Sequence, residues 1–85
     1  MFVTYVLYSR KFDKIYIGVT SDLIDRFQSH NFRSTKGYTV SYRPWEVLLV
    51  EFFETKSEAI RREKALKSSR GRAFIWEQVG LISVG

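Results

Sequence analysis

The chain has 85 residues, a net charge of +5 and no cysteine. This length supports one hydrophobic core, so we expect a single domain over residues 1–85. The lack of cysteine excludes disulfide frameworks and thiolate zinc sites, and it fits a reducing cytoplasm. The apolar run at residues 2–8 is too short to span a membrane and lacks the layout of a signal peptide, so we expect a cytoplasmic protein. The basic balance favours nucleic acid as a partner, although many small proteins are basic for solubility.

The first half of the chain predicts a hairpin followed by a helix. Residues 2–9 and 15–20 are rich in β-branched and aromatic residues, and the polar stretch between them has the length of a hairpin turn. Residues 22–31 then predict a helix with Ser21 or Thr20 as its N-cap and Asp22 in its first turn. The polar residues 32–43 predict a loop, which ends at Pro44.

The second half predicts one strand and two helices. Residues 45–54 are almost continuously apolar, which predicts a strand buried on both faces. Thr55 and Glu58 form a capping box for a helix that runs to residue 67. Residues 68–72 break this helix, and residues 73–79 predict a short third helix. The order β-β-α-β-α-α indicates a small α+β fold, with helices flanking a three-stranded antiparallel sheet.

One carboxylate falls where the hydrophobic core is expected. On a helical wheel, Glu63 lies within the stripe formed by Ala59, Ile60 and Leu66. Burying an unpaired carboxylate is costly, so such a residue usually has an ion-pair partner or binds a metal. Lys67 lies about 40° from Glu63 on the wheel, where it is either a phosphate ligand or a solvated lysine.

Other polar groups also lie beside the expected core. Arg26 and His30 are one helical turn apart at the edge of an apolar stripe, so their side chains are neighbours. Each alone is explained equally well as a snorkelling arginine and a hydrogen-bonded histidine. Tyr5 and Tyr16 lie on the two hairpin strands, where core packing is the ordinary role of tyrosine. Gly18 weakens its strand unless another group must approach the backbone closely.

Together these segments resemble the GIY-YIG nuclease family over about residues 2–67. The stretches that match are VTY at 3–5, YIG at 16–18, the Arg-x-x-x-His pair, RPWEVLLVEFF and the EA-x-x-x-E-x-x-L-K helix. The chain looks most like the small stand-alone bacterial branch, which is related to the catalytic domain found in excinuclease. It departs from the pattern before the first tyrosine, where VT replaces GI. A late asparagine of some members also has no counterpart, because the only asparagine is Asn31.

The resemblance implies a divalent-metal-dependent endonuclease that hydrolyses DNA phosphodiester bonds in DNA repair or processing. Cleavage would be structure-selective or weakly specific. Glu63 would bind a single Mg²⁺ or Mn²⁺ ion, Tyr5 would assist the attacking water and Tyr16 would lie near the scissile phosphate. Arg26 would stabilise phosphoryl charge and His30 would support proton transfer. Gly18 matches the glycine of the second triplet and is expected at the substrate, and the position of Lys67 near Glu63 on the wheel makes it the second candidate substrate ligand.

The identity of the general base stays open at this point. A free phenol has a pKa of about 10, so Tyr5 is a poor base at neutral pH unless adjacent arginine and metal charge lower that pKa. His30, with an ordinary pKa of about 6.5, is the alternative. Specificity would come from backbone shape, a partner protein or self-association. The expected basic rim for the nucleic-acid backbone consists of Arg33, Lys36, Arg43, Arg70 and Arg72.

Two other classes of function compete with the nuclease. The chain is alternatively a catalytically silent nucleic-acid-binding module. It is otherwise a protein-interaction domain in which Glu63 pairs with Arg26 or Lys67. In that last case Glu63→Gln destabilises the fold, whereas at a metal site the same change abolishes cleavage and leaves stability nearly unchanged.

Overall fold

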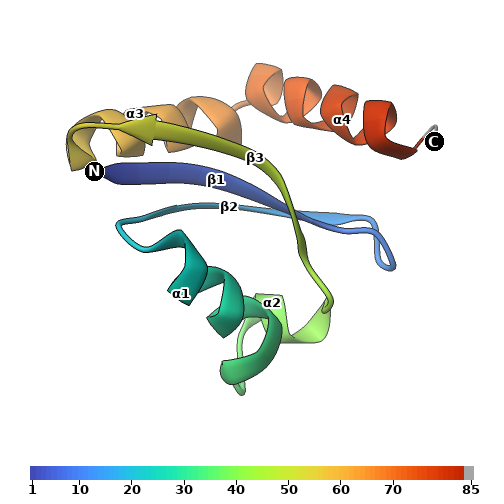
Figure 1. The fold of residues 1–85 in the computed structure, drawn as a ribbon. Helices are drawn as coiled ribbons and strands as arrows, with labels where there is room; N and C mark the ends of the chain where they lie inside the picture. Colours follow the sequence, from blue (N-terminus) through green and yellow to red (C-terminus); the bar gives the residue numbers. More distant parts are fainter. Residues whose placement is uncertain (84–85) are drawn as a thin grey trace.

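A three-stranded antiparallel sheet lies between two helical layers (Figure 1). The structure is a computed structural model that describes residues 1–83. Strands β1 (Phe2–Ser9), β2 (Lys14–Thr20) and β3 (Glu46–Phe53) have the spatial order β2-β1-β3. One face is covered by α1 (Leu23–Gln28), the π-helical segment η1 (Ser29–Arg33) and α2 (Tyr38–Ser41), and the other by α3 (Lys56–Lys67) and α4 (Ser69–Ser83). The predicted α+β fold with an antiparallel sheet is confirmed.

The central strand β1 contributes to a hydrophobic cluster on each face of the sheet, because its side chains alternate. Toward α1 the buried cluster comprises Val3, Tyr5, Leu7 and Trp45. Toward α3 and α4 it comprises Val6, Ile17, Leu66 and Ile75. The hydroxyl of Thr4 donates to the carbonyl of Ala59 over 2.7 Å, which fastens β1 to α3. Among residues 1–83, no helix combines the length and hydrophobicity needed to cross a membrane.

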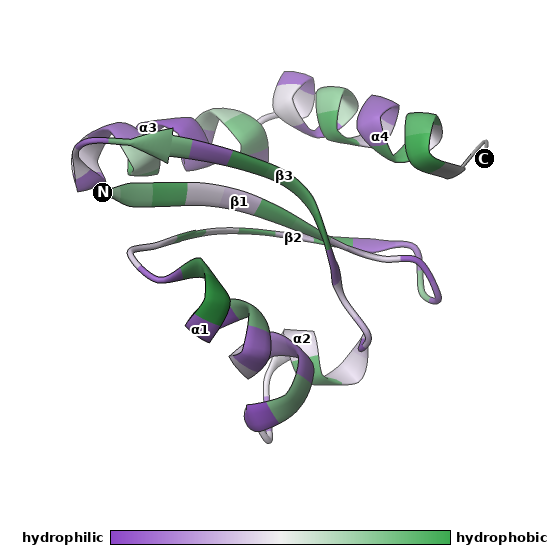
Figure 2. Ribbon diagram, viewed as in Figure 1, coloured by the Kyte–Doolittle hydropathy of each residue, from purple (hydrophilic) through white to green (hydrophobic). Residues whose placement is uncertain are grey.

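The strand predicted over residues 45–54 is confirmed as β3, but the prediction that it is buried on both faces is wrong. β3 lies at an edge of the sheet and leaves Val47 and Phe52 exposed by 43% and 64%. β1 is the strand with a neighbour on both sides, and all its residues from Val3 to Ser9 are buried. Figure 2 shows that β3 is largely hydrophobic, so its composition alone did not reveal its edge position.

Residues 32–43 are not the plain loop that their polarity predicts. They contain the end of η1 and the short helix α2. Trp45 fixes this region, since its indole nitrogen donates to the Thr39 carbonyl over 2.8 Å. Asn31 clamps the Trp45 backbone by accepting from its N–H and donating to its carbonyl. Arg43, expected on a nucleic-acid rim, instead donates to three carbonyls of the η1 region, those of Ser29, His30 and Ser34.

The two C-terminal helices meet at a tight junction. The hydroxyl of Thr55 accepts from the Glu58 backbone N–H, so Thr55 caps α3 as predicted. α4 begins at Ser69 and is therefore much longer than the predicted helix over 73–79. Gly71 permits this early start: a Cβ at residue 71 would lie 2.2 Å from the Ala65 carbonyl oxygen and 2.4 Å from Leu66 Cα. The glycine that was expected to break the helix lets two helices pack closely instead.

Candidate active site

Tyr5 lies in the middle of β1, directly opposite Gly18 of the edge strand β2. Its side chain is only 2% exposed, and its ring lies against the Gly18 backbone. A Cβ at residue 18 would lie 2.5 Å from the Tyr5 hydroxyl oxygen, so a larger residue would collide with the ring. The predicted close approach at Gly18 is thereby identified, and it lets the Tyr5 hydroxyl lie over the edge strand.

Tyr5, Tyr16 and His30 form one contact cluster. The Tyr5 hydroxyl lies 2.9 Å from His30 Nε2, within a buried hydrogen bond. The Tyr16 ring meets the His30 ring edge-on, with 4.7 Å between centroids, and lies 6.3 Å from the Tyr5 ring. Three predicted site residues from three separate elements therefore come together on one face of the sheet.

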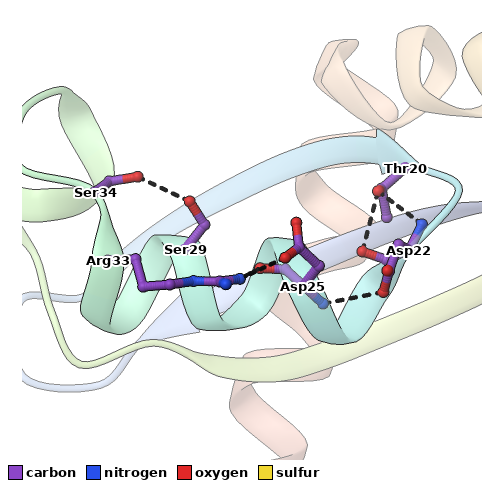
Figure 3. A network of polar contacts seen from close by, with 6 residues as sticks. All are labelled: Thr20, Asp22, Asp25, Ser29, Arg33 and Ser34. Atoms are coloured by element: carbon purple, nitrogen blue, oxygen red, sulfur yellow. Dashed lines mark hydrogen bonds and ion pairs between the residues drawn. The ribbon is translucent and has the colours of Figure 1, made fainter.

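The start of α1 is fixed by a local polar network (Figure 3). Asp22 is the N-cap, because its carboxylate accepts from the Asp25 backbone N–H over 3.0 Å. The prediction of Ser21 or Thr20 as N-cap is wrong. The hydroxyl of Thr20 instead accepts from the Asp22 backbone N–H and so orients the capping residue. The backbone N–H of Arg26 donates to the Asp22 carbonyl over 3.1 Å, so this cap also fixes the backbone of the first turn, to which Arg26 belongs.

A π-helical turn holds His30. The backbone N–H of Ser34 donates to the Ser29 carbonyl over 3.0 Å, and the two hydroxyls lie 2.9 Å apart (Figure 3). Arg33 donates to the Asp25 carboxylate over 2.6 Å and ties this turn back to α1. A single π turn inside a helix is rare and often accompanies a functional residue, and here His30 is the buried one, at 8% exposure.

Burial moves the pKa values of the two hydrogen-bonded groups in opposite directions. Burial first, and the neighbouring Tyr16 and Glu63 after it, raise the pKa of Tyr5 to about 12, although Arg26 opposes the change. Burial, together with Arg26 and Arg43, lowers the pKa of His30 below its ordinary value. Arg26 does lower the pKa of Tyr5, as expected of an adjacent arginine, but the opposite effect of burial is larger. At neutral pH the pair consists of a protonated phenol and an uncharged imidazole.

Two charged groups act on this pair from opposite helical layers. Arg26, an exposed residue of α1, influences the pKa values of both Tyr5 and His30. The side chain of Glu63 in α3 is 22% exposed, and its negative charge contributes to the raised pKa of Tyr5. The Glu63 carboxylate lies 3.7 Å from Lys67 Nζ one helical turn later. Of the two structural partners considered for Glu63, the structure pairs it with Lys67.

The donor set at this edge consists of oxygen atoms and one imidazole. No cluster of three or more His, Cys, Asp or Glu side chains occurs among residues 1–83. Within residues 1–83, Glu63 is the carboxylate whose charge acts on Tyr5. Hard cations such as Mg²⁺ accept this arrangement, because they bind one or two carboxylates and otherwise retain water.

The expected basic rim is only partly available. Arg33 and Arg43 are engaged as described above, and Arg70 lines a different cleft, beside Phe74. Arg72 donates to the Lys67 carbonyl over 3.1 Å and lines a cleft of about 360 Å³ beside Tyr16. Tyr38 also lines this cleft, a position that cannot be predicted from the sequence because residues 32–43 have no clear periodicity.

The fold and this cluster define a small α+β protein whose sheet brings two phenols and an imidazole together beside the edge strand β2. Residues 1–74 match the model of the GIY-YIG catalytic domain. The chain belongs to the GIY-YIG family, whose catalytic domain is that of nucleases.

Its relatives include small proteins named UPF0213. The UPF0213 protein H16_B0156 of Cupriavidus necator is 43% identical over 65 residues, which cover 73% of this chain and 71% of that protein. UPF0213 protein SA0446 of Staphylococcus aureus is 37% identical over 54 residues, covering 64% and 66% of the respective chains. The solution structure of UPF0213 protein BH0048 from Bacillus halodurans aligns with a TM-score of 0.49 at 25% identity, over 99% of this chain and 85% of that one.

Proposed function

We propose that this protein is a divalent-metal-dependent endonuclease that hydrolyses DNA phosphodiester bonds with structure-selective or weakly specific cleavage. The observation that carries the proposal is the 2.9 Å contact between the Tyr5 hydroxyl and His30 Nε2, with Arg26 and Glu63 both acting on it. A structural core needs no buried phenol–imidazole pair between opposite charges. The membership in a nuclease family agrees with this assignment.

The protonation states at neutral pH, a protonated Tyr5 and an uncharged His30, allow a proton relay. A protonated Tyr5 hydroxyl donates to a neutral His30 and presents an oxygen lone pair to the attacking water. As the water attacks phosphorus, its proton passes to the Tyr5 oxygen and the Tyr5 proton passes to His30 Nε2. The phosphorus–oxygen bond to the leaving group breaks, and that oxygen takes a proton from solvent. In this scheme Tyr5 and His30 share the role of the base, so the choice between them is unnecessary.

The remaining charged groups would bind and orient the phosphate. Arg26 offers planar, paired donors that match phosphate oxygens, and its exposure leaves it accessible to a polyanion. Glu63 would hold the Mg²⁺ or Mn²⁺ ion with a single carboxylate. When bound, such an ion polarises the phosphoryl group and offsets its negative charge. Lys67 would move from Glu63 to a phosphate oxygen as the ion binds.

The structural alternative has one observation in its favour, the ion pair between Glu63 and Lys67. Its N–O distance is 3.7 Å and the Lys67 side chain is 49% exposed. A pair this open to solvent contributes about 0–1 kcal/mol. The ion pair with Lys67 therefore adds little stability, which favours a role for Glu63 in binding a metal.

The test compares cleavage of labelled duplex, branched and single-stranded DNA by wild type, Glu63→Gln and Arg26→Ala, in Mg²⁺, Mn²⁺ or EDTA. The matched control is Glu54→Gln, which removes an exposed carboxylate that follows β3. We expect metal-dependent cleavage that both site variants lose and the control retains, with the urea midpoint of Glu63→Gln close to wild type.

Two outcomes would reject the nuclease assignment. If no substrate is cut while salt-sensitive DNA binding persists, the protein is a binding module. If Glu63→Gln unfolds at markedly lower urea than Glu54→Gln and nothing is bound, Glu63 is a structural residue. DNA repair as the biological role, a protein partner or self-association that supplies specificity, and a cytoplasmic location remain parts of the proposal.

A further inference from the structure

A row of aromatic rings leads away from the candidate active site toward the tip of the β1–β2 hairpin. The Tyr16 ring stacks on Tyr38 with 6.5 Å between centroids and 28° between planes. Tyr38 contacts Tyr42 at 4.8 Å, and Tyr42 contacts Phe12 at 5.5 Å. We call these four residues, Tyr16, Tyr38, Tyr42 and Phe12, the aromatic row. The Tyr38 hydroxyl lies 3.5 Å from the Ile15 carbonyl, so α2 is held against β2.

Two lysines are interleaved with this row. Lys14 Nζ lies 5.5 Å from the centre of the Tyr42 ring, and Lys11 Nζ lies 5.4 Å from that of Phe12. The neighbouring acids are engaged: Asp13 accepts from the Tyr8 hydroxyl, and Glu46 pairs with Arg10 over 2.9 Å. Asp13 keeps its negative charge in this contact, but Lys11 and Lys14 outnumber it, so the charge beside the aromatic row is net positive, which favours a polyanion.

The aromatic row is continuous with the candidate active site. Tyr16 contacts His30 at its inner end. The cleft of about 360 Å³ beside it is lined by Tyr16, Tyr38, Lys67 and Arg72. From Tyr16 through Tyr38 and Tyr42 to Phe12, consecutive ring centroids are 6.5, 4.8 and 5.5 Å apart. A bound strand could thus reach from the site along several nucleotides.

The exposure of the rings distinguishes binding from packing. Trp45 is 3% exposed and supports α2 from the inside. Tyr38 and Phe12, in contrast, are 49% and 40% exposed. Rings that served only to pack α2 would be covered on both faces. In a duplex the bases stack on one another and offer a protein only their edges, whereas unpaired bases stack on exposed aromatic side chains.

We propose that the aromatic row and its two lysines bind an unpaired stretch of nucleic-acid strand, whose bases stack on Tyr38 and Phe12 while a phosphate enters the site beside Tyr16. This inference rests on the proposed nuclease function and specifies the shape of its substrate. DNA and RNA share the chemistry invoked, namely stacking faces joined by phosphates.

The test measures binding in EDTA, so that it does not depend on cleavage. Labelled oligo-dT, oligo-U and a dT·dA duplex are titrated by fluorescence anisotropy with wild type, Tyr38→Leu, Tyr38→Phe and Phe12→Leu. The control is Phe52→Leu, because Phe52 is an exposed aromatic residue on the opposite edge strand. Thermal unfolding of each variant accompanies the titrations.

We expect wild type to bind the single strand more tightly than the duplex. Tyr38→Leu and Phe12→Leu should each weaken single-strand binding roughly 5- to 100-fold while leaving the thermal midpoint close to wild type. Tyr38→Phe, which keeps the stacking face, and Phe52→Leu should bind like wild type. The oligo-dT and oligo-U arms then identify which nucleic acid is preferred.

Three results would overturn the inference. In the first, wild type binds the duplex as tightly as the single strand, or more tightly. In the second, Tyr38→Leu and Phe12→Leu weaken binding of the single strand and of the duplex by the same factor. In the third, both leucine variants bind the single strand like wild type. If the inference fails while duplex DNA is cleaved in a Glu63-dependent manner, the proposed function stands. If single strands bind through the aromatic row but no substrate is cut, the proposed function fails and the inference stands.

Discussion

Gly18→Ala tests whether the site depends on the close approach of Tyr5 to the edge strand. The added Cβ would lie 2.5 Å from the Tyr5 hydroxyl oxygen and 2.6 Å from Cζ, both well inside van der Waals contact. The Tyr5 ring is 2% exposed and bonded to His30, so it has little room to move aside. The substitution should therefore displace the hydroxyl and break its contact with His30.

Three contributions set the expected magnitude. Overpacking costs about 1–3 kcal/mol, and loss of the Tyr5–His30 hydrogen bond costs about 1 kcal/mol. Alanine recovers about 0.5–1 kcal/mol relative to glycine in a strand. We therefore expect Gly18→Ala to lower the free energy of unfolding by about 1–3 kcal/mol. Misplacing the Tyr5 hydroxyl by about 1 Å should also reduce cleavage on the order of 100-fold.

Urea unfolding followed by tryptophan fluorescence measures the first effect, and the cleavage assay measures the second. A double-mutant cycle separates the collision from other effects of the methyl group. In a Tyr5→Leu background the atoms that meet the new Cβ are gone, so Gly18→Ala should become neutral or slightly stabilising. The reasoning is refuted if the substitution costs the same in both backgrounds, or if the single variant matches wild type in stability and cleavage.

Three further predictions concern other parts of the molecule. Gly71→Ala should lower the free energy of unfolding by about 2 kcal/mol or more, because the added Cβ meets the α3 backbone. Gly80→Ala, in the same helix, has open space for its Cβ and should raise the free energy of unfolding by about 0.5–1 kcal/mol. Asn31→Ala should cost about 1–3 kcal/mol in urea unfolding, since the Trp45 backbone loses both of its side-chain partners. Stability should also fall as the pH drops below about 6.5, where the unfolded state protonates His30 before the folded state, in which its pKa is lowered. This decline should level off below the folded-state pKa, and His30→Gln should remove that part of the slope in unfolding measured at pH 5, 6 and 7.

Local patterns in the sequence were sufficient where a side chain's role depends on its near neighbours. The hairpin follows from alternating β-branched and aromatic residues, and the start of α3 follows from the cap formed by Thr55. The proximity of Arg26 and His30 needs only helical spacing, and both residues indeed act on Tyr5. Gly18 indicated a close contact with the backbone, because glycine weakens a strand unless another group approaches there, and that group is the Tyr5 ring.

The missed features depend on contacts that no local pattern encodes. β3 is hydrophobic enough for a central strand, but its place at the edge is decided by which strands pair with β1. Gly71 indicates a helix break unless the nearby end of α3 is known. The high pKa of Tyr5 follows from burial, which the sequence does not reveal, while the presence of Arg26 suggested the opposite direction.

The candidate site draws its groups from β1, β2, the α1–η1 helix and α3, so it exists only where both helical layers cover the sheet. Glu63 is the last of these groups in chain order, so a growing chain lacks it until α3 has been made. Until then, on our proposal, the polypeptide could neither hold the metal ion nor cut a strand. Thermal inactivation should accordingly coincide with the cooperative loss of the sheet. A cell would thus be exposed to the nuclease only as a finished fold, and not to its fragments.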